Sequence, residues 1–405
     1  MRFIAPLVFL FMLLIGISGC TVSPQPGIYA LTDEQVEAVL LTDELNFESL
    51  SHGIERSIQY FDRLSATASF DYGELRYSAQ EMKASMRLFL HILENHSGHE
   101  RIAEIKEKFL FFESRNNSGK AFFTGYYEPL LTGSLVPSEQ YPVPIYGVPT
   151  DLITVDLGKF NDELKGKQIV GRLSQNQLIP FDERKEISYR NSLNNRASIL
   201  GYTFNHIELF FLQIQGSGVL LLDDGSKVRL NYAGQNGRSY KAIGALLKEK
   251  IPPEEMSMQT LKKYLYEHPE EVPKILSFNP SYTFFRIVEE GPLGNIQVPL
   301  TPGRSVAMDH RLIPKGSLAF IETTYPPKYL EGTVAGTAGL RALHRYVLVQ
   351  DTGGAIRGYG RADIFWGNGE TAEKIAGYMQ NEGRIILLVA RKDFLNSDLL
   401  PIAQR

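Results

Sequence analysis

Cysteine is nearly absent from this chain of 405 residues, in which Cys20 is the only one. No thiol therefore remains beyond position 20 that an oxidising compartment could oxidise. An excess of one charge is also lacking, since 42 lysines and arginines stand against 46 aspartates and glutamates, for a formal net charge of −4. With no tract rich in lysine and arginine either, the sequence offers no electrostatic basis for binding nucleic acid.

Motifs for metals and nucleotide cofactors are missing as well. The eight histidines are scattered. The segment that holds His96 and His99 (ENHSGHE) has no cysteine or third histidine nearby to complete a zinc pattern. Neither a P-loop nor the glycine pattern of a dinucleotide-binding fold occurs. We therefore expect no metal and no cofactor.

One long apolar run occurs, at residues 3–15, after an arginine and before the sequence Ser-Gly-Cys. The run is too short to cross a bilayer as a helix, and it has the shape of the hydrophobic region of a signal peptide. A cysteine directly after Ser-Gly resembles the processing site of bacterial lipoproteins. We therefore expect residues 1–20 to be a lipoprotein signal peptide, with Cys20 as the lipidated residue. The alternative is an ordinary signal peptide in which the cysteine is accidental.

The residue after this cysteine bears on location. Thr21 stands where an aspartate would favour retention in the inner membrane. By that rule, which comes from lipoproteins as a class, the protein is expected at the periplasmic face of the outer membrane, held there by its lipid anchor.

The rest of the chain has the composition of a globular protein, with 43% hydrophobic and 22% charged residues, and a length that suggests two domains. Residues 32–112 repeat apolar positions with a helical period, whereas the pattern becomes strand-like after Gly119. This predicts a β-rich α+β fold with a helical N-terminal lobe. Strands are expected at residues 121–127, 210–215, 219–222 and 384–389, and helices at 240–250, 261–268 and 371–381.

The strongest chemical signal lies at residues 347–370, VLVQDTGGAIRGYGRADIFWGNGE. An apolar strand ends at Asp351, glycines that include Gly353 and Gly354 allow a tight turn, and Asp363 precedes a second apolar segment. Two carboxylates on either side of such a turn suit acid–base chemistry. The alternative is that both aspartates only cap turns.

Seven segments resemble one known family, that of the membrane-bound lytic murein transglycosylases A. They occur in the family's order with similar separations, over nearly everything after residue 121. They are FTGYYEP (123–129), YPVPIYG (141–147), FLQIQGSG (211–218), YAGQNGRSYKAIG (232–244), NPSYTFFR (279–286), VPLTPGRSVAMDHRLIPKG (298–316) and DTGGAIRGYGRADIFWGNG (351–369).

The resemblance implies a six-stranded double-psi β-barrel as the catalytic domain, formed by residues 21–128 and 281–405. Its three-aspartate domain would cover about residues 298–392. A smaller β domain, residues 129–280, would be inserted between the two parts. The glycan strand would lie in the groove between these domains.

The resemblance also implies a chemistry, the non-hydrolytic cleavage of peptidoglycan that leaves a 1,6-anhydromuramoyl end. A single carboxyl can serve both steps because the sugar's own 6-hydroxyl attacks, and the family pattern puts this acid and base at Asp363. To act as an acid it needs a raised pKa, either from burial or from a nearby like charge, which Asp351 could supply. Thr124 is expected to assist, and Asp309 is expected to hold its own turn.

Other residues are expected along the groove by resemblance, with weaker support from the residues themselves. Aromatic rings suit the CH faces of sugars, and hydroxyl and amide groups suit their polar edges. For each tyrosine, core packing is the alternative, and the same holds for Trp366, three residues after Asp363. The expected substrate-binding residues are Tyr126, Tyr127, Gln215, Gly216, Ser217, Tyr232, Asn236, Gly353 and Gly354.

Two other classes of protein compete with this interpretation. The segment VLVQDTG imitates the signature of pepsin-like aspartic proteases, but their chemistry needs two such aspartates and the chain holds one DTG. A peptidoglycan-binding lipoprotein without activity is the second alternative. It would share the fold, although none of the seven segments is broken and the candidate acid is present.

Overall fold

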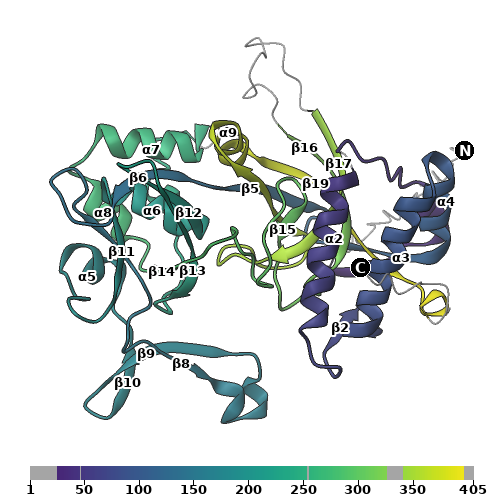
Figure 1. The fold of residues 1–405 in the computed structure, drawn as a ribbon, viewed down its shortest axis with the longest axis horizontal. Helices are drawn as coiled ribbons and strands as arrows, with labels where there is room; N and C mark the ends of the chain where they lie inside the picture. The colour runs from purple at the N-terminus through teal and green to yellow at the C-terminus, as the bar shows by residue number, and fades with distance from the viewer. Residues whose placement is uncertain (1–24, 46, 253–254, 326–340, 396–405) are drawn as a thin grey trace, which may run out of the picture.

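The computed structural model describes residues 25–45, 47–252, 255–325 and 341–395 (Figure 1). The predicted signal peptide and Cys20 lie outside these residues. In the part of the chain that is described, no helix is both long and apolar enough to span a bilayer.

Eight strands form the larger sheet, in the order β1-β4-β19-β16-β17-β15-β18-β5. Because β5 pairs with β18 on one side and β19 on the other, the six strands from β19 to β5 close into a barrel. This confirms the predicted β-rich α+β class and its barrel. The strands are β1 (Gly27–Ala30), β4 (Phe109–Arg115), β5 (Ala121–Glu128), β15 (Ser305–Ala307), β16 (Leu318–Tyr325), β17 (Arg341–Asp351), β18 (Arg361–Asn368) and β19 (Gln380–Ala390).

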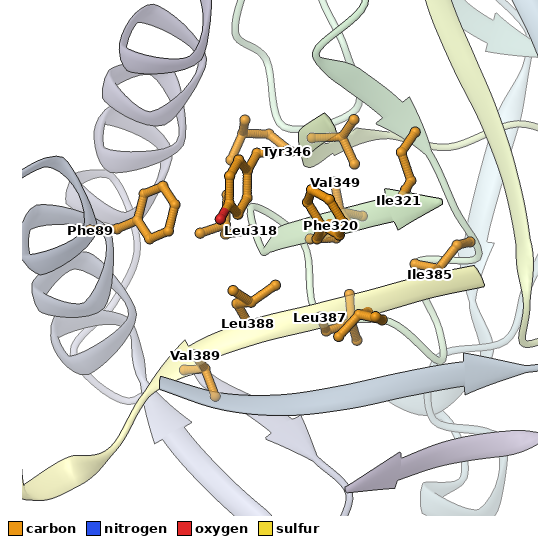
Figure 2. Close-up of a cluster of buried hydrophobic side chains, with 14 of the residues drawn as sticks. Phe89, Leu318, Phe320, Ile321, Tyr346, Val349, Ile385, Leu387, Leu388 and Val389 are labelled. Carbon is orange, nitrogen blue, oxygen red and sulfur yellow. The ribbon is translucent and has the colours of Figure 1, made fainter. Parts of the chain in front are cut away.

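The helical N-terminal lobe packs against the barrel (Figure 1). It consists of α1 (Asp33–Glu37), α2 (Phe47–Asp62), α3 (Ala79–Asn95), α4 (Gly98–Lys108) and the hairpin of β2 (Ser69–Tyr72) and β3 (Leu75–Ser78). Helix α3 begins at a capping box, in which Ser78 and Glu81 each accept from the other's backbone N–H. Its buried Phe89 stacks edge-on against Tyr346 of β17, which in turn meets Phe320 of β16 (Figure 2). Lobe and barrel thus share one core.

The second sheet has the order β14-β13-β12-β6-β11-β7, and the chain enters it directly after β5 and leaves it before β15. Its helices cover it at one end of the molecule, and a three-stranded sheet, β10-β9-β8, projects from it (Figure 1). The elements are β6 (Leu130–Ser134), β7 (Val143–Tyr146), β8 (Ile153–Asp156), β9 (Gln168–Ser174), β10 (Gln177–Pro180), α5 (Arg184–Tyr189), β11 (Ile199–Thr203), α6 (His206–Gln215), β12 (Ser217–Leu222), β13 (Lys227–Gln235), α7 (Met258–Glu267), α8 (Val272–Ser277) and β14 (Thr283–Ile287).

Two element predictions are wrong, and both lie in this second region. Residues 210–215 form the end of helix α6 instead of a strand, capped by Asn205 and ended by Gly216 in the left-handed conformation. The segment, FFLQIQ, ends in an alternation of apolar residues and glutamines that resembles the period of a strand. Residues 240–250 contain only the short 3₁₀ helix η3 (Ile243–Leu246). The other two predicted helices occur as α7 and α9 (Glu370–Tyr378).

Candidate active site

Asp351 and Asp363 lie in one row across neighbouring barrel strands. Asp363 on β18 is paired with Ala307 on β15 and with Thr124 on β5, while Asp351 at the end of β17 is paired with the same Ala307. Residues directly opposite each other in a sheet project from the same face. The Cα atoms of the two aspartates are therefore about 10 Å apart, two strand spacings, with only an alanine between them.

A bulge puts Asp351 into this row. Val306 is paired with Val349, but the next residue, Ala307, is paired with Asp351, so that Gln350 is the extra residue. Without it, Asp351 would project from the same face as the core residue Val349. Gln350 is buried and bonds Ser305 and the backbone of Gly53 in α2, which fixes the bulge. Bulges beside active sites commonly redirect a side chain in this way.

Both oxygens of Asp351 are occupied. Oδ2 accepts from the hydroxyl of Tyr126 at 2.8 Å, and Oδ1 accepts from the backbone N–H groups of Asn295 at 2.9 Å and Thr352 at 2.8 Å. Burial raises the pKa of Asp351 to about 6, and the charge of Asp363 adds to this rise, while the three hydrogen bonds oppose it. The carboxyl group of Asp351 is thus fixed by three hydrogen bonds, and its pKa is raised.

Asp363 has one oxygen held and the other open. The Thr124 hydroxyl donates to Oδ1 at 2.6 Å, and no group in the described residues bonds Oδ2. Burial raises the pKa of Asp363, against the positive charge of Arg361 and the hydrogen bond of Thr124. Burial, one of the two causes that the sequence left open, is therefore the largest cause of the rise.

Arg361 determines how Thr124 bonds. Its Nη2 donates to the Thr124 hydroxyl oxygen at 2.8 Å. A threonine hydroxyl has one proton, and because its oxygen already accepts from Arg361, that proton points to Asp363. Arg361 was not among the site residues expected from the sequence. Its position two residues before Asp363, next to the apolar segment that begins at Ile364, was the signal that could have found it, because such residues share a face if the strand begins at position 361.

Asp309 lies outside this row. Its buried carboxylate accepts from the Arg311 guanidinium at 2.6 and 2.8 Å and from the Gly358 N–H at 3.0 Å. Burial would raise the pKa of Asp309, but these hydrogen bonds outweigh it and hold the pKa well below its ordinary value. The carboxylate joins its own turn to the loop after Asp351, the kind of structural contact that the sequence suggested.

The expected substrate-binding residues are in different environments. Tyr126 is buried and packs on Phe365 as part of the carboxyl site. Tyr127 is also buried, and its N–H donates to the side chain of Gln215 at 3.1 Å, which ties β5 to α6. Gly216 ends α6 and Ser217 is buried at the start of β12, whereas Tyr232 is 46% exposed. Gly353 and the exposed Gly354 lie in the loop after Asp351.

Asn236 does not fit the substrate-binding role expected for it. It is completely buried, and its Nδ2 donates to the backbone carbonyls of Asp182 and Pro280 at 2.9 Å. Its Oδ1 accepts from the N–H of Tyr282 at 2.9 Å. With these bonds made, the side chain holds three segments of the second region together and leaves nothing to offer a glycan.

One group in the described residues has the ligand spacing of a metal site, His268 with Glu270 and Glu271. Lys250 donates to both oxygens of Glu271 at 2.7 Å, so this carboxylate already has a cationic partner. The group lies around the turn between α7 and α8, in the second region, and takes no part in the row of aspartates.

Comparison with known proteins connects both parts of the chain to one family. One family model, the MltA specific insert domain, matches residues 122–286, and another, the 3D domain, matches residues 304–389. The membrane-bound lytic murein transglycosylase A of Escherichia coli K12 is 32% identical over 281 residues, 68% of this chain and 67% of that protein. The protein of the same name from Vibrio cholerae is 30% identical over 275 residues, 67% of this chain and 66% of that protein.

A solved structure extends the match to the whole fold. The crystal structure of a membrane-bound lytic murein transglycosylase from Agrobacterium tumefaciens has a TM-score of 0.72 at 27% identity, over 90% of this chain and 98% of that one. In sequence, the chain spans about two thirds of the length of the curated relatives above. The two family models together include β15, β17 and β18, three of the four strands that carry the row of aspartates, and all of β5 except Ala121.

Proposed function

The chain belongs to the membrane-bound lytic murein transglycosylase A family, and we propose that Asp363 carries out both proton transfers of its murein cleavage. The observation that supports this most directly is the difference between the two carboxyls. Asp351 has both oxygens occupied, whereas Asp363 has Oδ1 held by Thr124 and Oδ2 open. A general acid needs an oxygen that can reach the leaving group.

The reaction balances with this single carboxyl. Protonated Asp363 gives its proton to the oxygen that links N-acetylmuramic acid to N-acetylglucosamine, and the bond from the anomeric carbon to that oxygen breaks. The 6-hydroxyl of the same muramic acid residue attacks the anomeric carbon, and its proton goes to Asp363. The product is a 1,6-anhydro ring, no water is consumed, and the enzyme regains its starting protonation.

Thr124 and Arg361 support these steps by orientation. Because the Thr124 proton is directed at Oδ1, that oxygen acts as an acceptor in both protonation states, and the exchanged proton belongs on Oδ2. Asp351, bonded by three donors, is poorly placed to activate a water as the second carboxylate of a hydrolase would. The two carboxylate charges disfavour each other's ionisation, and burial, the largest cause, favours the protonated form of Asp363.

We place the glycan strand along the barrel face that carries this row. The groove would lie between the barrel domain, formed by residues 21–128 and 281–405, and the inserted domain, residues 129–280. Contacts between the two regions flank the row and support this placement. On the β19 side, Gln380, which is paired with Thr124, donates to the carbonyl of Met256 at 3.2 Å. On the other side, the Leu293 N–H donates to Asn231 of β13 at 2.7 Å.

The products of digestion test the proposed function. Purified murein sacculi treated with the protein should yield muropeptides with anhydromuramic ends, each lighter by one water than the corresponding reducing product. Mass spectrometry of the digest distinguishes the two. Reducing muramic ends as the main product would reject the single-carboxyl mechanism in favour of hydrolysis.

We also propose that Cys20 is lipidated and anchors the protein at the periplasmic face of the outer membrane. Replacing Cys20 by alanine should leave the precursor without a lipid and move the protein out of the outer-membrane fraction, because no other anchor is expected. Fractionation with immunoblotting measures this. A soluble form that starts after Cys20 should still digest murein, and firm association of that form with membranes would contradict the anchor.

A further inference from the structure

An open cavity of about 510 Å³ lies on the barrel beside the row of aspartates. Its walls are the end of β4, the turn between β4 and β5, and the start of β19. Five of its seven residues are charged, three positive and two negative. The lining residues are Glu113, Arg115, Gly119, Lys120, Glu382, Gly383 and Arg384.

Strand register connects this cavity to the proposed site. Thr124 is paired with Asp363 and Gln380, and two residues earlier Phe122 is paired with Arg361 and Glu382. Side chains two residues apart on a strand share a face, so the second row runs beside the first. Glu382 lies on β19, two strand spacings from Asp363 on β18, and in the second row. This geometry puts their Cα atoms about 12 Å apart.

The second row forms an accessible strip between the two sites. The Arg361 guanidinium lies 5.3 Å from the centre of the Phe122 ring, and both side chains are partly exposed. Glu382 at the end of this row is exposed and pairs with Lys120. The Phe122 ring beside the Arg361 cation, followed by the polar cavity, suits a ligand chain in which small apolar groups and charged groups alternate.

The two arginines of the cavity are paired with carboxylates but keep unused hydrogen-bond donors. Glu113 is 4% exposed and accepts from Arg115 and Arg384; burial alone would raise its pKa, but these hydrogen bonds hold it below its ordinary value. Arg384 also donates through Nη1 to Glu322 at 2.8 Å. Within the described ranges, Nη1 of Arg115 and Nη2 of Arg384 have no acceptor, so each arginine can still donate to a ligand.

We propose that this cavity binds the peptide branch of murein, an inference that rests on the proposed function. Murein carries short peptides on its muramic acid residues, with free carboxylates and an amine. Arginine and lysine donors suit the carboxylates, and Glu382 suits the amine. Four extended residues span at most about 13–14 Å, which is enough to cover the distance from a muramic acid at Asp363 to Glu382.

The test compares two substrates, glycan strands with their peptides and the same strands after an amidase has removed them. Lys120→Gln removes one half of an ion pair whose two side chains are more than half exposed, so folding should not depend on it. Its kcat/KM on peptide-bearing strands should fall about threefold to fivefold, with no change on bare strands. The kcat/KM of Arg384→Gln on peptide-bearing strands should fall further, by about tenfold or more.

Two controls separate binding from folding. Arg76→Gln removes a positive charge from an exposed ion pair in the β2–β3 hairpin and should behave as the unaltered protein on both substrates. Thermal unfolding identifies any loss of structure in Arg384→Gln, in which Glu113 loses one of its two partners.

The outcomes are distinct. A loss confined to peptide-bearing strands supports the peptide site. Equal losses on both substrates, or no loss with Lys120→Gln and Arg384→Gln, would mean that the charged cluster only supports the end of the barrel. If the unaltered protein cleaves neither substrate, the proposed function fails, and the inference fails with it.

Discussion

Replacing Asp363 by asparagine should reduce murein cleavage by about 10⁴-fold, the upper end of the range for general acid–base catalysis, because the same group serves both proton transfers. Asparagine has nearly the same shape, and its amide oxygen can still accept from Thr124. Fold and glycan binding should therefore persist. The rate of release of anhydro-muropeptides measures the loss, and co-sedimentation with sacculi measures binding.

Stability provides an internal check on this variant. Burial makes the folded-state pKa of Asp363 higher than its unfolded value. Stability from this group is therefore fully present below the unfolded pKa and is lost as the pH rises through the folded pKa. Asp363→Asn avoids that loss, so its melting temperature should exceed that of the unaltered protein at pH 7 and match it in acid. A lower melting temperature at pH 7 would mean that lost activity reflects damaged structure.

Asp351→Asn is the matched comparison. It should lower activity by a smaller factor, because Asp351 has no free oxygen for the substrate. Loss of its charge also lowers the pKa of Asp363, so the high-pH limb of kcat/KM should move to lower pH. If Asp351→Asn is inactive while Asp363→Asn keeps more than about a tenth of the activity, the acid is the carboxyl whose pKa is raised to about 6, Asp351.

The sequence located these two carboxyls because their segment has an unusual composition, and family resemblance assigned their roles. It did not reveal the row itself. Thr124 meets Asp363 across 239 positions of sequence, and Ala307 separates the aspartates only because a bulge at Gln350 changes the register of β17. Register depends on which strands become neighbours in the closed barrel, and a local pattern does not contain that information.

The predictions that failed share a physical cause. Residues 210–215 imitate a strand because glutamines alternate with apolar residues at their end, but Gln213 is buried in α6, where its side chain bonds Arg184 and the carbonyl of Thr283. Asn236 was expected in a groove by family resemblance, but backbone groups of Asp182, Pro280 and Tyr282 need its amide. In both cases tertiary contacts, not local sequence, determine the role.

Gly125 shows how packing behind the site should control activity. It lies between Thr124 and Tyr126, the partners of the two aspartates, in the segment FTGYYEP. A Cβ at this position would lie 2.6 Å from Nε1 of Trp366 and 2.8 Å from the backbone Cα of Ala376 in α9. These contacts are too short for any carbon atom, and a backbone atom cannot move aside as the end of a flexible side chain can.

Gly125→Ala should therefore push β5 away from α9. This would shift the hydroxyls of Thr124 and Tyr126 away from the two aspartates that they bond. Displacements of about 1 Å in a catalytic site cost about 10²-fold in rate, and we expect at least that loss of murein cleavage. The overpacked strand should also destabilise the fold by roughly 1–3 kcal/mol. Because Trp366 is the only tryptophan in the chain, its fluorescence emission reports the displacement directly.

Gly234→Ala is the control for this substitution. It also adds one methyl group to a strand glycine, but the nearest atom to the new Cβ is Cγ2 of Val148 at 3.6 Å, an ordinary contact. This variant should keep its activity, its emission spectrum and, to within about 0.5 kcal/mol, its stability. Unchanged activity and emission in Gly125→Ala would contradict the idea that contact with α9 positions Thr124 and Tyr126, and would leave their orientation to Arg361 and the barrel alone.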